Sequence, residues 1–226
     1  MVPKPIIIFD LDGTLVDTAP DLLGALNVIL VREGRRAVTI TELRHLVGHG
    51  ARAMFEHALL ATGEAVPADR LAFLIDGFLD HYRANIARES RPFPGVPETL
   101  TRLAGQGAAM GVCTNKPHDM SELLLAELDL ARFFPAVHGA GRTPYNKPDP
   151  RHLADVIAAL GGAKERAVMV GDSATDVKVA RAAGVPVIVM SYGYTPMPAR
   201  ELGADAVSDD FAEVPDLVRR LLASRF

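Results

Sequence analysis

The fold of this chain is decided by the stretch IIIFDLDGTLVDT, which spans residues 6–18. Its first four residues are apolar, and three of them are β-branched, a pattern that is typical of a short buried strand. Asp10 and Asp12 follow where this strand ends, and Gly13 allows the chain to turn sharply there. Ligands bind at the carboxyl ends of the strands in open α/β sheets. A tight turn alone explains Asp12, but the second carboxylate makes this strand end a candidate active site.

The composition is that of an ordinary globular protein. Of the 226 residues, 49% are hydrophobic and 23% are charged, which suits one domain or one domain with a modest insertion. The net charge of −4 and the isoelectric point of about 6.0 favour neither nucleic acid nor a membrane surface as partner. No apolar run approaches the roughly 20 residues that span a bilayer. The single cysteine, Cys113, excludes an internal disulfide, so we expect a buried core thiol in a cytoplasmic protein. The expected oligomeric state is a monomer or a homodimer.

Residues 17–90 form a block in which only helices are predicted. Thr18 and Asp21 have the spacing of a capping pattern at the start of the first helix. Further helices are expected over residues 51–60 and 68–87. The last of them carries one apolar face, made of Leu71, Leu74, Ile75, Phe78 and Tyr82. We therefore predict an all-helical domain at residues 17–90, inserted directly after the opening turn.

From residue 91 onward, helix, strand and turn alternate along the chain. Strands are predicted at residues 109–114, 136–139, 167–171 and 185–190. Helices are predicted at 96–104, 120–128, 150–160, 175–183 and 214–223. This alternation is typical of a parallel sheet covered by helices. We therefore predict an α/β fold, a doubly wound parallel sheet with a Rossmann-like core formed by residues 1–16 and 91–226.

The ends of the later predicted strands carry chemically active side chains. The second strand ends in Thr-Asn-Lys at residues 114–116, and Lys147 lies in the segment after the third. The fourth ends at residue 171 and is followed by Asp172 and Asp176. In a doubly wound sheet these ends lie along one edge, so the side chains should converge on the opening carboxylates.

These residue types point to phosphoryl transfer. A carboxylate can attack phosphorus and form an aspartyl-phosphate, which divides one difficult displacement into two easier ones. Because a carboxylate and a phosphate repel each other, the reaction needs a hard cation such as Mg²⁺. Asp10, Asp12 and Asp172 can supply its oxygen ligands. Thr114 can hold phosphoryl oxygens, and Lys147 can neutralise the remaining charge.

The motifs DLDGTLVDT (residues 10–18), TNK (114–116), KP (147–148) and GDSATD (171–176) resemble the four motifs of the haloacid dehalogenase superfamily, in the same order. The helical insertion is similar to the C1 cap of that superfamily, so the resemblance covers the whole chain. It implies that Asp10 is the nucleophile and that Asp12 is the general acid and base. Chemistry independently favours an acid at Asp12, since an alkoxide leaving group needs a proton. An acid at this position also favours phosphate ester chemistry over dehalogenation.

The resemblance also implies a metal site. Asp172 would hold Mg²⁺ together with the side chain of Asp10 and the backbone carbonyl of Asp12. Asp176 would be a supporting carboxylate behind these ligands.

A phosphate site is implied by the same motifs. Thr114 and Lys147 would bind the phosphate, and we place Asn115 with them. Lys116 either contacts the leaving group or simply begins the next helix.

The helical insertion should select the substrate. Residues 46–52 and 91–96 are similar to the corresponding segments of bacterial phosphoglycolate phosphatases. Glycines on both sides of His49 form a turn of close approach, and Arg52 can bind a substrate carboxylate through two hydrogen bonds. The alternative is that this turn only connects two helices and that Arg52 is solvated. His49, Arg52 and Lys116 are therefore candidate specificity residues.

These observations lead to a Mg²⁺-dependent phosphatase of a small phosphorylated metabolite, with 2-phosphoglycolate as the expected substrate. The alternatives are a sugar phosphomutase of the β-phosphoglucomutase type and a phosphatase of another sugar phosphate. A third hypothesis is a silent binding module, which is disfavoured because every proposed catalytic position holds a competent residue.

Overall fold

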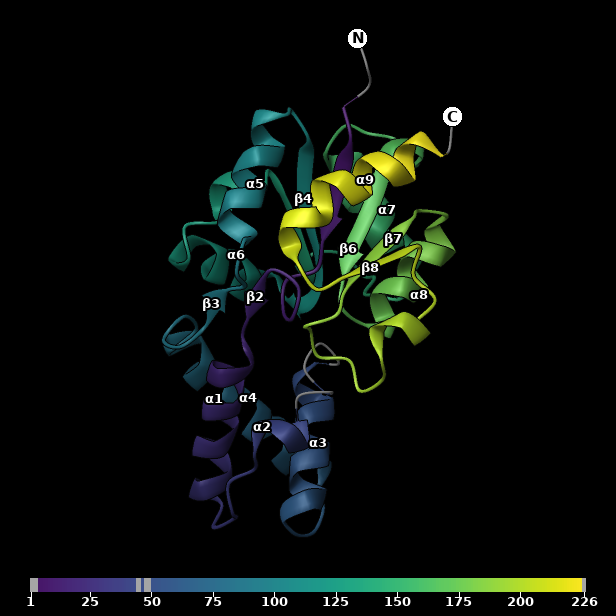
Figure 1. Cartoon of the computed structure of the whole chain (residues 1–226). Helices are drawn as coiled ribbons and strands as arrows, with labels where there is room; N and C mark the ends of the chain where they lie inside the picture. Colours follow the sequence, from purple (N-terminus) through teal and green to yellow (C-terminus); the bar gives the residue numbers. More distant parts are fainter. Residues whose placement is uncertain (1–3, 44–45, 47–49, 225–226) are drawn as a thin grey trace.

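The computed structural model describes residues 4–43, 46 and 50–224, and a parallel sheet forms its centre (Figure 1). The strand order in this six-stranded sheet is β5-β4-β1-β6-β7-β8. The strands are β1 (Ile6–Phe9), β4 (Ala109–Pro117), β5 (Ala136–Ala140), β6 (Ala167–Gly171), β7 (Val187–Met190) and β8 (Ala206–Ser208). Every pairing in the sheet is parallel, and β1 lies between β4 and β6. The predicted doubly wound α/β fold is confirmed.

The apolar residues of β1 build two layers of core, one on each face of the sheet. Ile7 and Phe9 pack with apolar residues of the helices α5 (Val96–Gly105), α6 (His118–Glu127) and α9 (Val214–Ala223). Ile6 and Ile8 pack with α7 (Pro150–Ala159) and α8 (Ala174–Ala183) on the opposite face. Successive side chains of a strand point to opposite faces, so an unbroken apolar run needs helices on both sides. This packing fixes β1 at the middle of the sheet, with its carboxyl end beside those of β4 and β6.

A separate group of helices lies beyond the carboxyl ends of the strands, at the end of the molecule away from both termini (Figure 1). These helices are α1 (Ala19–Arg32), α2 (Ile40–Leu43), α3 (Ala51–Thr62) and α4 (Ala68–Ala84). The predicted apolar face of α4 is buried against its neighbours, and the ring of Phe78 packs edge-on to that of Phe55 in α3 with 5.4 Å between centroids. We call this group the cap.

The chain passes between sheet and cap along a short antiparallel ribbon. Its strands are β2 (Val16–Asp17) and β3 (Arg91–Pro92). The sequence did not predict these strands, because two residues are too few to show an alternating pattern. The proposed domain boundaries, after residues 16 and 90, both fall in or beside this ribbon.

The strands that line the carboxyl edge differ from the prediction in two places. β4 continues to Pro117, so Lys116 belongs to the strand, and the suggestion that it begins the next helix is wrong. The edge strand β8 was missed because it is only three residues long and two of them are only partly buried.

Cys113 lies within β4 and is fully buried, which confirms its predicted place in the core. Burial raises the pKa of its thiol to about 12. Within the described residues, no helix combines the length and the apolar character needed to cross a bilayer.

Asp21 joins the start of α1 to the chain that returns from the cap. It does not form the predicted N-terminal capping pattern of the helix with Thr18. Thr18 occupies the N-cap position but makes no side-chain capping bond. The buried carboxylate of Asp21 accepts hydrogen bonds from the backbone N–H groups of Glu89 and Ser90 and from the Ser90 hydroxyl, at 2.7–3.0 Å. The predicted capping pattern is wrong because the Asp21 carboxylate bonds to residues 89 and 90, far away in the sequence, and not to the start of its own helix.

Replacing Asp21 with Ala should destabilise the protein, because it leaves the buried N–H and hydroxyl of Ser90 and the part-buried N–H of Glu89 without their acceptor. We expect a loss of about 1–3 kcal/mol in the free energy of unfolding, measured by urea denaturation. Asp76→Ala is the matched control, since Asp76 lies on α4 with an exposed side chain. Equal stability of both variants would contradict the joining role of Asp21.

Candidate active site

Asp10 is held at the end of β1 by backbone and side-chain contacts. Its N–H donates to the carbonyl of Val170 in β6 (2.9 Å), which extends the strand pairing to the site. Its Oδ1 accepts the backbone N–H of Leu11 (2.7 Å) and lies 2.8 Å from the ammonium of Lys147. Both contacts use Oδ1, so Oδ2 is the oxygen placed for chemistry.

Lys147 lies between two carboxylates. Its Nζ is 2.8 Å from Asp10 and 2.7 Å from Oδ1 of Asp176, and all three side chains are buried. Burial opposes the charge on the lysine, but Asp10 and Asp176 outweigh this effect and raise the pKa of Lys147. The ammonium is therefore a permanent positive charge beside the candidate nucleophile.

Asp172 follows β6 and is held in a fixed orientation by the residues around it. The Thr14 hydroxyl donates to Oδ1 (2.9 Å), and the backbone N–H of Tyr194 donates to Oδ2 (2.7 Å). A Cβ atom added at Gly193 would lie 2.2 Å from the Cβ of Asp172, and one at Gly13 would lie 2.5 Å from its Oδ2. The carboxylate therefore occupies space that only glycine leaves open.

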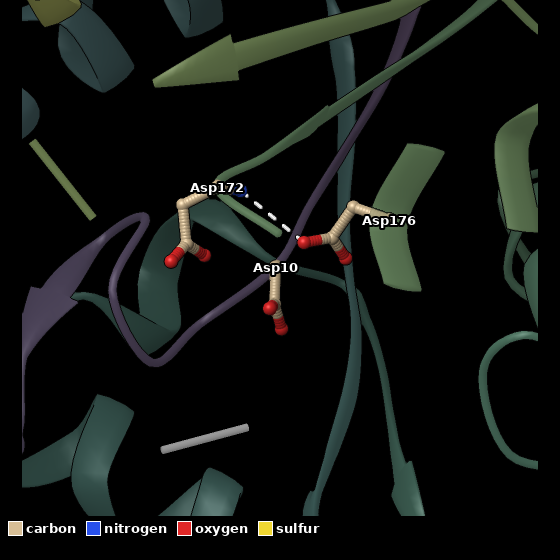
Figure 2. A group of neighbouring side chains, drawn as sticks. All are labelled: Asp10, Asp172 and Asp176. Atoms are coloured by element: carbon tan, nitrogen blue, oxygen red, sulfur yellow. Dashed lines mark hydrogen bonds between the residues drawn. The ribbon is translucent and has the colours of Figure 1, made fainter. Parts of the chain in front are cut away.

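Asp10, Asp172 and Asp176 come together from the end of β1, from the loop after β6 and from α8, with their side chains close to one another (Figure 2). Each can offer one oxygen to a group in which all oxygens lie within 4.8 Å of one another. Burial raises the pKa of Asp10 to about 7, a rise that Lys147 counteracts and Asp176 reinforces. Burial, with added repulsion from Asp176 and Asp10, also raises the pKa of Asp172. Three buried carboxylates thus lie together while Lys147 contacts only two of them, an excess of negative charge that suits a hard divalent cation.

Asp176 is already engaged by protein donors. Its Oδ1 accepts from Lys147, and its Oδ2 accepts from the backbone N–H groups of Asp172 and Ser173 and from the Ser173 hydroxyl. The bond from the Ser173 N–H, together with the reciprocal bond from the Asp176 N–H to the Ser173 hydroxyl oxygen, forms a capping box at the start of α8. Asp10 and Asp172 are therefore better placed than Asp176 to bind a cation, which fits a supporting role for Asp176.

Thr114 and Asn115 lie at the end of β4 beside this cluster. Thr114 is buried, and its hydroxyl accepts the backbone N–H of Lys116 (3.2 Å), which leaves its proton for another acceptor. The side chain of Asn115 donates to the carbonyl of Lys147 (3.0 Å) and accepts its N–H (2.9 Å). Asn115 thus braces the backbone that carries the lysine ammonium, whereas Thr114 has a proton to donate.

Asp12 and Lys116 form a second buried ion pair. Gly13, with a φ of 85°, turns the chain so that its N–H donates to the carbonyl of Val16 (2.9 Å), and Asp12 lies in this turn. The Nζ of Lys116 lies 3.0 Å from Oδ1 of Asp12 and donates to the hydroxyl of Tyr82 (2.6 Å), which comes from α4 of the cap. Burial disfavours the positive charge of Lys116, but the interactions with Asp12 and Tyr82 outweigh this effect and raise the pKa of the lysine.

A cavity of about 140 Å³ opens between sheet and cap at this ion pair. Its described lining includes Asp12, Lys116 and Asn115 from the core and Leu22, Met54 and Phe78 from the cap. The charged groups of the described lining therefore come from the core, whereas the cap contributes mainly apolar side chains.

Of the two other specificity candidates, Arg52 is absent from the described lining of this cavity. Arg52 is exposed on α3 and forms an ion pair with Glu56 at 2.9 Å, the solvated alternative stated above. His49 lies outside the described residues.

The sequence is similar to known proteins along almost its whole length. Residues 7–190 match the family described as haloacid dehalogenase-like hydrolase. The chain belongs to this family. A phosphoglycolate phosphatase of Caulobacter vibrioides is 50% identical over 218 residues, which cover 96% of this chain and 92% of that protein. A phosphoglycolate phosphatase of Mesorhizobium japonicum is 44% identical and covers 97% of both chains.

The structure of this haloacid dehalogenase-like hydrolase is similar to solved structures of the family. One is the crystal structure of a predicted phosphoglycolate phosphatase from Haemophilus somnus 129pt, with a TM-score of 0.89 and 28% identity. The comparison covers 96% of this chain and 99% of that one. Together with the relatives, it identifies this chain as a phosphatase.

Sequence reasoning missed several residues that complete the site of this phosphatase. Tyr82 lies on a helix face that looks like ordinary core. Tyr194 follows β7, and its hydroxyl donates to Asp17 (2.5 Å) and accepts the N–H of Thr18 (2.8 Å). The segment Ser-Tyr-Gly-Tyr at residues 191–194 also follows a strand, so the search for polar strand ends could have found Tyr194.

Replacing Gly193 with Ala should displace Asp172 and reduce phosphatase activity, because the new Cβ would occupy the space of that side chain. We expect at least about a tenfold loss of kcat/KM for p-nitrophenyl phosphate with Mg²⁺, since small misplacements in active sites cost this much or more. Gly24→Ala is the control, because nothing lies within 4 Å of its added Cβ. Full activity of a folded Gly193→Ala variant would contradict the role of this glycine.

Proposed function

We propose that this phosphatase hydrolyses 2-phosphoglycolate to glycolate and phosphate, with Mg²⁺ as cofactor and an aspartyl-phosphate on Asp10 as intermediate. The observation that carries the proposal is the buried group of Asp10, Lys147 and Asp172, with Asp12 and a small cavity beside it. The names of the relatives that are 50% and 44% identical support the substrate.

The first half-reaction begins at Asp10. Its Oδ2 attacks phosphorus, the bond between phosphorus and the ester oxygen breaks, and the phosphoryl group becomes attached to the carboxylate. Lys147 lies next to the nucleophile and stabilises the charge on the phosphoryl oxygens, and the Thr114 hydroxyl donates a hydrogen bond to one of them.

Asp12 handles the proton in both half-reactions. In the first, it donates a proton to the alkoxide of the leaving glycolate. In the second, the carboxylate so formed takes a proton from water, whose oxygen attacks phosphorus and releases phosphate and free Asp10. The reaction balances, because the proton that Asp12 gives to glycolate is recovered from the attacking water.

Asp10 and Asp172 would hold Mg²⁺ together with the backbone carbonyl of Asp12, and Asp176 would keep these ligands in place. The ion supplies Lewis-acid neutralisation of the charge that the phosphate brings to a cluster of carboxylates. Oxygen donors alone, buried and in excess negative charge, suit this hard cation.

Replacing Asp10 with Asn should abolish turnover, because the amide keeps the shape but is not a nucleophile. We expect at least about a thousandfold loss of kcat for 2-phosphoglycolate, and removal of Mg²⁺ by a chelator should stop the wild-type enzyme. In isotopically labelled water, the label should appear only in phosphate, because water attacks phosphorus and Asp10 keeps its own oxygens. A phosphate ester that is chiral at phosphorus should react with net retention of configuration, because each of the two displacements inverts it. Inversion at phosphorus would indicate a single direct attack by water, and label in the carboxylate of Asp10 would indicate attack at its carbonyl carbon.

Replacing Asp12 with Asn should slow the hydrolysis of a phosphate ester to an extent that depends on its leaving group. Glycolate leaves as a basic alkoxide that needs a proton, whereas p-nitrophenolate leaves readily without one. We expect a loss of about 100-fold or more in kcat for 2-phosphoglycolate and a much smaller loss for p-nitrophenyl phosphate. Equal losses for both esters would show that Asp12 does not act as the acid.

A further inference from the structure

Lys116 is a buried cation that the catalytic steps above leave without a task. Its side chain is only 2% exposed, and the two bonds found among the described residues engage Asp12 and Tyr82. An ammonium has three N–H donors, so one is left for a further acceptor. A buried lysine is costly to maintain unless its charge is used or compensated, and one carboxylate with one phenol leaves it able to bind a second anion.

The position of Lys116 coincides with the place of the leaving group. A general acid must lie within hydrogen-bond distance of the ester oxygen that it protonates. In 2-phosphoglycolate the carboxylate carbon is two bonds away from this oxygen. A group that contacts Asp12 on the cavity side therefore lies beside the substrate carboxylate, and Lys116 is such a group at 3.0 Å.

The cavity around Lys116 suits a short anionic leaving group. Lys116 is the only cation in its described lining, and the cap contributes apolar side chains such as Leu22, Met54 and Leu79. The hydroxyl groups of a sugar would lose their hydrogen bonds to water against these side chains. The volume of about 140 Å³ is also well below the roughly 300–1,000 Å³ of pockets for larger ligands.

Tyr82 connects this cation to the cap. Its hydroxyl accepts a hydrogen bond from Lys116 (2.6 Å), and the ammonium also lies 4.5 Å from the centroid of its ring. The ring itself is buried in the cap and stacks on Phe78 with 5.9 Å between centroids. Because α4 carries the tyrosine, the position of the lysine ammonium depends on the cap lying over the sheet.

We propose that Lys116 binds the carboxylate of the substrate and so determines the preference for 2-phosphoglycolate, and that Tyr82 is a positioning residue that holds its ammonium. This inference rests on the proposed function. It assigns recognition of the carboxylate to the end of β4 in the core, instead of to Arg52 on the cap.

The test compares two esters that differ only in charge. One is 2-phosphoglycolate, and the other is the phosphate ester of glycolamide, which has nearly the same shape but no carboxylate. The quantity measured is the ratio of their kcat/KM values, from which any general damage to catalysis cancels. The wild-type enzyme should prefer 2-phosphoglycolate by about 100-fold or more, as expected for a buried charged pair.

In Lys116→Met this ratio should fall by about 30-fold or more, chiefly through a higher KM for 2-phosphoglycolate. Lys116→Gln keeps a polar side chain without the charge and should lower the ratio as well, which covers the case that the methionine variant fails to fold. Tyr82→Phe keeps the ring and should lower the ratio by a smaller factor, about threefold to tenfold. Lys178→Met, which removes an exposed lysine on α8, should leave the ratio unchanged.

Two results would overturn the inference, and they differ in meaning. If the wild-type enzyme prefers 2-phosphoglycolate and both Lys116 variants keep that preference, the carboxylate is bound elsewhere and the proposed function stands. If the wild-type enzyme hydrolyses both esters equally well, the carboxylate is not recognised and the proposed substrate falls together with this role of Lys116.

Discussion

The structure depends on the placing of several carboxylates in one buried cluster at the end of a parallel sheet. Asp10, Asp172 and Asp176 repel one another, and burial adds to the cost of their charge. Lys147 offsets part of this cost by contacting two of them. Backbone N–H groups and the Thr14 hydroxyl hold the carboxylates in place. Such a cluster is stable only on a rigid frame, and the apolar strands β1, β4 and β6 provide it.

The same frame connects the cluster to the cap. Tyr194 contacts Asp172 through its backbone N–H and Asp17, at the entry to the cap, through its hydroxyl. Asp21 joins the start of α1 to the chain just before the return strand through its bonds to residues 89 and 90. The ring of Tyr192 packs against that of Phe93, which directly follows the return strand, with 4.3 Å between centroids. Both crossings between core and cap are therefore tied to the loop that orients Asp172.

The core and the cap divide the chemistry between them. The core supplies the carboxylates and the ammonium groups, whereas the cap supplies apolar side chains and one phenol to the cavity. The hydrogen bond from Lys116 to the hydroxyl of Tyr82 connects the core to the cap at this cavity. The described lining of the cavity contains no arginine, so under the proposed role of Lys116 the core, and not the cap, would supply the cation that binds a charged substrate.

The sequence by itself determined the fold class and the positions along the chain of five of the six strands, because apolar runs bounded by glycine and polar residues are local patterns. It also determined which side chains stand at the strand ends, and in parallel sheets this suffices to predict that Asp10, Lys147 and Asp172 converge. Only the tertiary structure decided what depends on distant partners. The role of Asp21 followed from residues 89 and 90, and the ribbon of β2 and β3 was too short to leave a pattern. Lys116 and Tyr82 are 34 residues apart in the chain, and no local sequence pattern predicts that their side chains are in contact beside Asp12.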